Sequence, residues 1–501
     1  MKFLLRMRFR RTTLLTVFCG SLVVGVGMAP SYALPGAVLY VGLLVAVVAA
    51  RRRGLAAAAG CMAFGLSIGL LRGAVFVRHQ AEFAALYGQQ ITLTARALTD
   101  ATYNTNKQFT FDAGDVTLPD ERTLHGVISV SGSGENGVFE GDILEITGKL
   151  QPTLGAAQAR MSYANFSLME HQVSIISTVR RSFAAGLQNA LPEPAGSFGL
   201  GLLTGQRSTL PDSTKLTLQM VGLTHVIAVS GYNMTIMLRA SKRSFGRISK
   251  RLSLALSFTL MILFLMITGL SASIVRAAIV SGISLLATYY GREIKPLLLI
   301  LAAAALTAYA KPYFVWSDAG WYLSFLAFGG VLIVSPLVAA RVRGRWREST
   351  LVAIGIESIS AEIATLPYVL HTFGQMTAVG LLANVVVVAF IPFAMMACMV
   401  AGLAGIFMPV LCGWLAWPAT LLLTYMLDTS TLLSRIPHVF HQNLYLTTAG
   451  MYCAYAAVIA LAVALSFKHR LQSGILTDKN YLQPTAQSTS LAASLERMRI
   501  T

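Results

Sequence analysis

Long apolar runs alternate with short basic clusters along most of this chain, and this alternation limits what it can fold into. The runs lie near 12–29, 35–50, 54–71, 252–270, 273–290, 297–310, 320–338, 350–372, 377–407, 412–434 and 445–467. A helix crosses a bilayer with about 20 apolar residues, the length of several of these runs. Only 12% of the 501 residues are charged, against 55% hydrophobic. The sequence therefore predicts a polytopic α-helical membrane protein with roughly 11–12 spans.

The formal net charge of +18 is explained by where the basic residues stand. Clusters at 51–53, 239–251, 292–295, 341–347 and 468–470 each adjoin an apolar run. Basic loops beside membrane spans face the cytoplasm. Topology therefore accounts for most of the excess charge without a nucleic-acid partner. We expect a multi-pass protein of the cell (cytoplasmic) membrane, with the N- and C-termini both cytoplasmic.

Residues 78–180 differ from the rest of the chain. Apolar and polar residues alternate at 90–97, 124–131 and 142–150, with turn-forming residues between them. Short alternating strands of this kind predict a small β-barrel, and 141–148 reads like an inner strand of an OB-type barrel. Three preceding spans place this inserted domain outside the membrane. It holds seven basic and eleven acidic side chains, so its charge alone does not support nucleic-acid binding, although a local basic face stays open.

The stretches 199–208 and 221–234 are apolar enough for membrane depth, yet they carry five glycines and several polar side chains. Irregular backbone and polar groups are costly in hydrocarbon unless protein or a wet cavity covers them. Pro211 and its polar neighbours indicate a kinked or re-entrant approach, followed by a crossing at about 217–238. We expect these stretches to line a path or a site inside the protein.

Signals for metal or nucleophile chemistry are weak. His438 and His441 lie close together but lack an acidic or cysteine companion, and none of the eight histidines fits a metal-binding pattern. The five cysteines all lie in apolar runs, which indicates no disulfide scaffold. Ser230 follows His225 by five residues, off the same helical face, and no Gly-x-Ser-x-Gly elbow is present. We predict no metal, no cofactor and no catalytic residue.

Ionisable side chains inside the apolar runs are candidates for function, because charge is costly at membrane depth. Arg72 ends the third run, Arg276 lies within another, Glu357 and Glu362 share a third, and Asp428 lies in the run at 412–434. Two interpretations stay open with equal weight. These groups line a path, or they form internal ion pairs such as Arg276 with Glu362.

Ordered sequence blocks carry a family resemblance. They are GLGLLTGQRS (199–208), GLTHVIAVSG (222–231), TGLSASIVRAA (268–278), DAGWYLSFLA (318–327), SISAEIATLP (358–367), FGQ (373–375) and GLLAN (380–384). In order and spacing they resemble the ComEC-type competence family of DNA-uptake channels, over about residues 195–400. The three-helix start with an external OB-like barrel is similar to that family more loosely.

The resemblance implies passage of single-stranded DNA across the cytoplasmic membrane in natural transformation (competence), by a channel rather than an enzyme. The resemblance implies a pore or translocation path. Its residues, two of which differ from the family pattern, are Gly205, Arg207, His225, Ser230, Gly231, Asn233, Arg276, Glu362 and Asn384. The departures are Asn233, where the family usually has histidine, and Glu362, where glutamine is common. Ser324 is carried over as well.

The resemblance also implies a domain division and partners. The division is 1–77, N-terminal transmembrane helices; 78–180, external OB-like barrel; 190–470, competence-type channel domain; and 471–501, polar cytoplasmic tail, mostly disordered. The partners are single-stranded DNA, membrane lipid, a DNA receptor and a cytoplasmic ATPase or helicase, since the sequence has no Walker-type phosphate loop.

Other functions remain to be weighed against the channel. Many family members carry a C-terminal metallo-β-lactamase-like domain, which this chain lacks, so we expect no nuclease role. The alternative is a transporter of another polar or anionic solute, which the acidic barrel favours modestly. An intramembrane serine hydrolase using Ser230 has less support.

Overall fold

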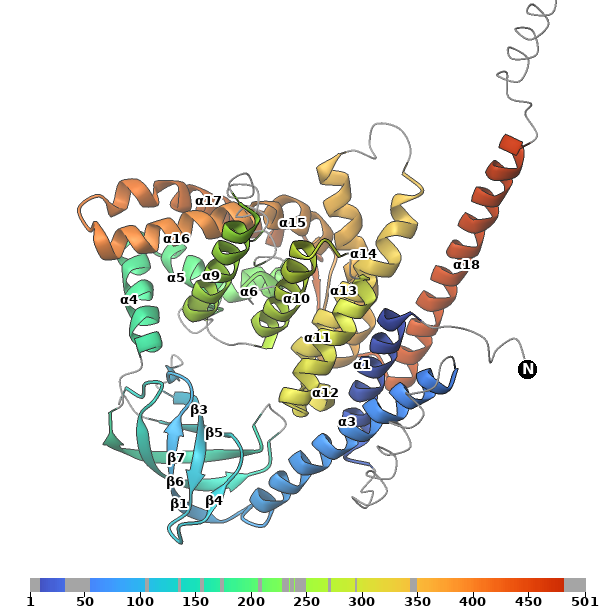
Figure 1. Ribbon diagram of the computed structural model, residues 1–501. Helices are drawn as coiled ribbons and strands as arrows, with labels where there is room; N and C mark the ends of the chain where they lie inside the picture. Colours follow the sequence, from blue (N-terminus) through green and yellow to red (C-terminus); the bar gives the residue numbers. More distant parts are fainter. Residues whose placement is uncertain are drawn as a thin grey trace, which may run out of the picture.

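The computed structural model has a β-sheet domain and a larger assembly of helices (Figure 1). It describes residues 10–31, 55–103, 108–133, 137–153, 157–171, 175–205, 210–227, 234, 238, 249–268, 272–292, 295–342 and 349–481.

Two helices begin the described chain, α1 (Arg11–Met28) and α3 (Leu55–Ala84). They cross closely because glycines lie at the contact: a β-carbon at Gly69 would lie 2.2 Å from the carbonyl oxygen of Leu22. α3 extends past this contact to the sheet domain (Figure 1). The apolar run at 35–50 lies outside the described residues.

The sheet domain closes on itself through its strand pairing. Its strands are β1 (Gln90–Ala97), β2 (Thr102–Tyr103), β3 (Gln108–Thr117), β4 (Thr123–Leu124), β5 (Ile128–Ser133), β6 (Ile143–Gln151) and β7 (Ala159–Glu170). β1 pairs with β6 on one side and with β3 on the other, so the circuit β1-β6-β7-β5-β3 returns to β1. The β5–β7 pairing is parallel and the other pairings of the circuit are antiparallel.

Alternating side chains fill the inside of this sheet, because successive residues of a strand point to opposite faces. Phe109 and Phe111 of β3 and Ile146 of β6 are fully buried in its core. The alternation at 90–97 and 142–150 therefore predicted β1 and β6 correctly, to within one residue at each end.

The amphipathic helix α4 (Ile175–Ala190) connects the sheet domain to the membrane helices. It packs against α16 (Ile391–Phe407) and buries Phe183 there. One turn earlier in the helix, Arg180 Nη1 lies 3.0 Å from Glu140 Oε2 of the sheet domain. The helix is thus held to α16 by apolar packing and to the sheet domain by an ion pair.

The remaining helices follow the apolar runs closely. They are α5 (Ala195–Thr204), α6 (Asp212–Met220), α7 (Thr224–Ile227), α9 (Lys250–Thr268), α10 (Ala272–Tyr289), α11 (Pro296–Ala310), α12 (Tyr313–Ser317), α13 (Ala319–Ala339), α14 (Thr350–Phe373), α15 (Gly380–Val387), η3 (Val388–Phe390), α17 (Cys412–Ser434) and α18 (Thr448–Tyr481). Two short strands, β8 (Met376–Thr377) and β9 (Phe440–His441), pair antiparallel. The run at 377–407 is divided between α15, η3 and α16.

Within the described residues, seven helical segments are long and apolar enough to cross a membrane, and three shorter helices are apolar. The protein is therefore a polytopic helical membrane protein, as predicted. The count of 11–12 spans stays a prediction, since the run at 35–50 and residues 228–233 are outside the described part. α18 continues past 471 to Tyr481, and residues 482–501 of the expected tail are likewise outside it.

Candidate functional site

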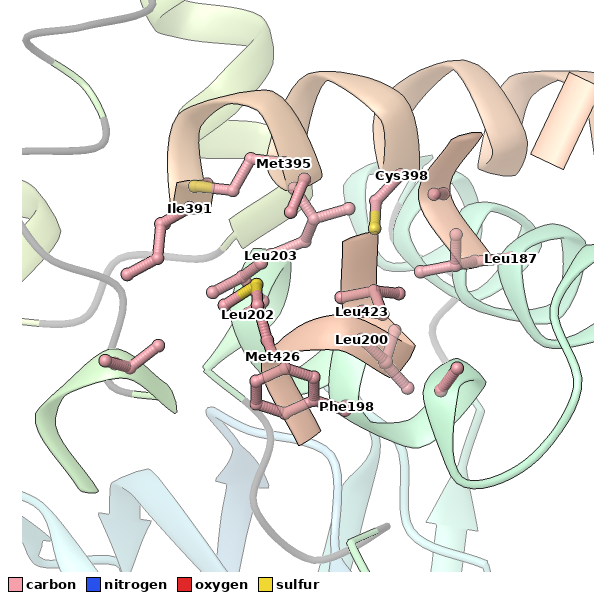
Figure 2. Packing of buried hydrophobic residues seen from close by; sticks show 14 of the residues in the cluster. Leu187, Phe198, Leu200, Leu202, Leu203, Ile391, Met395, Cys398, Leu423 and Met426 are labelled. Carbon is pink, nitrogen blue, oxygen red and sulfur yellow. The ribbon is translucent and has the colours of Figure 1, made fainter. Parts of the chain in front are cut away.

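α5 lies in the centre of an apolar cluster. Nine of its ten residues are buried. Its leucines and Phe198 meet side chains of α16 and α17, with Met395, Cys398, Leu423 and Met426 around them (Figure 2). Because apolar side chains cover it, the helix itself lines no open path. The part of α5 that matters for a path is therefore its C-terminal end at Gly205.

Gly205 ends α5 in a left-handed conformation. Its φ is 73°, and its N–H donates to the carbonyl oxygen of Gly201 at 2.9 Å. Glycine adopts this helix-ending conformation without the strain that a β-carbon brings. The chain therefore turns sharply just before Arg207, which lies outside the described residues.

A second break separates α6 from α7. Gly222 has a φ of 77°, and the Leu223 N–H donates to the carbonyl oxygen of Leu218 at 2.8 Å. His225 follows at once, with its Nδ1 3.0 Å from the carbonyl oxygen of Gly222. This break lies inside the crossing that the sequence predicted at about 217–238, whereas the kink was expected near Pro211. Ser230, Gly231 and Asn233 are outside the described residues, so their predicted roles are untested.

The turn between α6 and α7 meets the loop between α14 and α15. A β-carbon at Gly222 would lie 2.6 Å from Thr377 Cγ2. A β-carbon at Gly380 would lie 3.8 Å from Glu362 Oε1 and 3.9 Å from the carbonyl oxygen of Val221. The α6–α7 turn and the α14–α15 loop, which are more than 130 residues apart in sequence, therefore lie against each other.

Polar groups without partners mark the same place. Thr377 Oγ1 and Asn384 Oδ1 are buried and have no hydrogen-bond partner. Nearby, Gln219 Nε2 donates to Gln375 Oε1 at 3.0 Å. Buried polar atoms are normally satisfied, so unpaired ones call for an explanation. The space holds hydrogen-bonding capacity that the described protein atoms leave unused.

Arg276 of α10 forms a separate centre. Its side chain is buried, with the residue 4% exposed, and Nη2 donates to the carbonyl oxygen of Gly320 at 3.1 Å. The guanidinium lies over the Phe325 ring, 5.4 Å from its centroid. Nε and Nη1 have no partner among the residues that the structure describes. The ion pair with Glu362, one of the two interpretations of these charges, is not formed among the described residues.

Asp318 arranges the partner of Arg276. Its Oδ1 accepts from the Trp321 N–H at 2.6 Å and so caps the first turn of α13. This places Gly320 and Phe325 beside Arg276, which joins two of the sequence blocks quoted above. A cation that keeps two unpaired nitrogens inside the protein can donate to an anionic or carbonyl-bearing ligand.

Comparison with known proteins agrees with the sequence blocks. The family model described as Competence protein matches residues 202–470, more than half of the chain. The chain belongs to this competence family. It is also 25% identical over 243 residues to ComE operon protein 3 of Bacillus subtilis (strain 168). That match covers 48% of this chain and 30% of the relative, so the chain spans less than a third of the relative's length. No solved structure matches.

The family-matched region contains every predicted path residue, but the structure divides those it describes. Glu362 lies beside Gly380 near the α6–α7 turn with Gly222 and His225, whereas Arg276 lies with α13. Asn384 follows Gly380 by one turn of α15. Sequence reasoning missed Thr377, which lies between two quoted blocks and has no pattern of its own. It could have found Gly380, since this glycine opens the GLLAN block.

Proposed function

We propose that this protein is a cytoplasmic-membrane channel for the uptake of single-stranded DNA in natural transformation. The observation that carries the proposal is the meeting of family sequence blocks at a broken helix within a membrane domain. α6 and α7, the FGQ-to-GLLAN loop and α14 contribute polar atoms to one place.

A membrane path for single-stranded DNA must meet two physical requirements, water and hydrogen-bond donors with positive charge. A polyanion cannot cross hydrocarbon, so it needs a wet route with hydrogen-bond donors and some positive charge. Arg276 and His225 are donors within the described part, and Arg207 and Asn233 are assigned to the same path from sequence. Gly205 provides a turn, Ser230 and Gly231 are assigned to the path from sequence, and Glu362 and Asn384 complete the proposed lining.

The sheet domain, in this proposal, is an OB-like barrel on the outer face that meets the incoming strand. Its support is the closed five-strand circuit with a parallel β5–β7 pair. Tyr163 of β7 is 86% exposed and has a φ of 55°, a conformation costly for a bulky side chain. Lys149 of β6 pairs with the adjacent Ser162, and Arg160 is the second residue of β7. An exposed ring on a strand that also carries an exposed cation suits base stacking beside phosphates.

Topology and partners complete the proposal. Both termini are cytoplasmic, the domains divide at 78, 180–190 and 471, and the protein is not an enzyme. A DNA receptor delivers the strand from outside, and a cytoplasmic ATPase or helicase drives it, since the sequence contains no Walker-type motif.

Labelled DNA supplied to a transformable host that carries this gene tests the proposal. Deleting the gene should leave DNA bound at the surface but absent from the cytoplasm, and a plasmid copy should restore entry. Tyr163→Ala should lower strand binding, with exposed Tyr290→Ala of the membrane domain as its matched control. Unchanged cytoplasmic entry in the deletion strain refutes the channel.

A transporter of another polar or anionic solute is the second candidate, favoured by the eleven acidic side chains of the sheet region. Purified protein in vesicles separates the two. Passage of small anions without binding or passage of single-stranded DNA would decide for the transporter.

A further inference from the structure

The connection between α16 and α17 is exposed, yet it is almost wholly apolar. We call residues 406–415 (IFMPVLCGWL) the apolar turn; all of them are exposed except the half-buried Cys412. Val410 is 92% exposed and Trp414 is 84% exposed. The sequence has no Asp, Glu, Lys, Arg or His from 373 to 427. An exposed apolar surface of this extent marks contact with a membrane or with another protein.

The opposite end of α17 is different. Arg435 follows the helix directly, and the connection to α18 carries His438, His441 and Gln442, all of them exposed. Side chains that are charged or form hydrogen bonds are the ordinary content of a connection that lies in water. The two ends of one helix therefore suit two different surroundings, water at the C-terminal end and an apolar medium at the N-terminal end.

The apolar turn stands beside α4, the helix that leads from the sheet domain to the membrane helices. α16 and α17 pack together and lie crosswise to α4, and their connection projects beyond it at the edge of the helical assembly (Figure 1). The crossing is at Gly405, one residue before the turn, where a β-carbon would lie 1.9 Å from the carbonyl oxygen of Gly186. The position of the turn is therefore tied to that of α4.

α4 also gives the depth of the apolar turn. Near the start of the helix, the ion pair of Arg180 with Glu140 is only partly buried, so it belongs in water or among lipid headgroups. Gly186 follows Arg180 by six residues, which is at most about 9 Å farther into the membrane at 1.5 Å per residue. Apolar surfaces at membrane interfaces are buried to about 5–10 Å, at the boundary of headgroups and acyl chains.

We propose that the apolar turn binds phospholipid acyl chains in the leaflet that faces the sheet domain, and that it reaches water on neither side of the membrane. Trp414 and Trp417 are exposed there, and tryptophan is enriched where headgroups meet acyl chains. A protein partner is a poorer fit, because protein interfaces have a polar rim and the turn offers no polar side chain besides the Trp414 indole. The proposal requires no DNA and stands or falls separately from the channel.

Fluorescence quenching in phospholipid vesicles tests this on the full-length protein with its five cysteines replaced. Val410→Cys provides a single site in the apolar turn, and Gln442→Cys is the matched control near the opposite end of α17. Each is labelled with bimane in detergent and then reconstituted. Bimane at Val410→Cys should lose most of its fluorescence in vesicles of brominated-acyl phospholipid and keep it with iodide on both sides of the membrane. Gln442→Cys should show the reverse.

Two outcomes overturn the proposal. Quenching of Val410→Cys by iodide would place the apolar turn in water. Quenching by neither agent would mean that a protein surface covers it. Each variant is first checked for a single elution peak, so that loss of the fold is not mistaken for a change of surroundings. Leu411→Cys, another exposed position of the turn, replaces Val410→Cys if that variant does not fold, and its result is interpreted in the same way.

Discussion

Gly405 of α16 allows α4 to approach closely, and replacing it tests how the sheet domain is attached. A β-carbon at Gly405 would lie 1.9 Å from the carbonyl oxygen of Gly186 and 2.6 Å from its carbonyl carbon. Non-bonded atoms need about 3.5 Å, so Gly405→Ala must push the helices apart by roughly 1.5 Å. The contact is with backbone, which cannot rotate away as a side chain can. Phe183 of α4 is packed at this crossing and would lose contacts.

The expected magnitude follows from two opposing effects. In a helix, alanine is more stable than glycine by about 1 kcal/mol. Overpacking costs about 1–3 kcal/mol, and a clash with backbone belongs at the upper end. Gly405→Ala should therefore lose about 2 kcal/mol of stability. Gly413→Ala in α17 has no atom within 4 Å of the new carbon and should gain at most about 1 kcal/mol.

Thermal unfolding of the two variants in one detergent measures this difference. Gly186→Ala is a second test of the same crossing, because its β-carbon would lie 2.7 Å from the Gly402 carbonyl oxygen. Proteolysis between the sheet domain and α4 should be faster in both crossing variants than in Gly413→Ala. If Gly405→Ala is as stable as Gly413→Ala, the close approach of α4 and α16 described here is wrong.

Substitutions at three further positions test the capping, the buried cation and the sheet domain. Asp318→Ala should lower stability by about 1 kcal/mol through loss of the α13 cap, and Asp318→Asn should retain most of it in the same unfolding measurement. Arg276→Met should leave the unfolding temperature unchanged or higher, because it removes a cation with two unpaired nitrogens. It should also lower transformation frequency by roughly tenfold or more. A loss of thermal stability that matches the loss of transformation would assign Arg276 a structural role only. Burial raises the pKa of Asp112, and the weaker effects of Lys311 and Ser129 oppose this shift. At a pH above the ordinary pKa of an aspartate, the buried carboxyl must ionise or stay protonated at a cost, so Asp112 destabilises the folded state there. Asp112→Asn should therefore stabilise the protein at pH 7, with the gain vanishing below about pH 4, and a gain that persists at low pH would contradict this cause.

The helices were predictable where sequence contrast marks their ends. The run at 412–434 coincides with α17, which Arg435 follows, and that at 350–372 coincides with α14 to within one residue, because Ser349 and Gly374 flank it. The division of 377–407 into α15, η3 and α16 was not predictable. Residues 385–393 there are wholly apolar except for the proline at 392, so hydropathy does not mark the break.

The grouping of the candidate residues was not predictable from the sequence. Glycines with polar neighbours predicted an irregular backbone in this stretch, because only a special backbone needs that mixture at membrane depth, but they did not predict that helices would break at Gly205 and Gly222. Charge alone could not tell whether Arg276 meets Glu362. The answer depends on which part of α13 faces each helix: Gly320 faces Arg276, whereas a β-carbon at Gly330 would lie 2.4 Å from the Ser360 carbonyl oxygen of α14. Such contacts follow from helix packing, which a single sequence does not specify.

The separation of Arg276 from Glu362 has a consequence for the proposed path. Had the two charges paired, neither would act on a passing strand, and the pair would need no ion. Apart, Arg276 attracts phosphate while Glu362 repels it. A glutamine there would present an amide without charge. A glutamate in the same place is compatible with a polyanion only if a proton or another cation neutralises it.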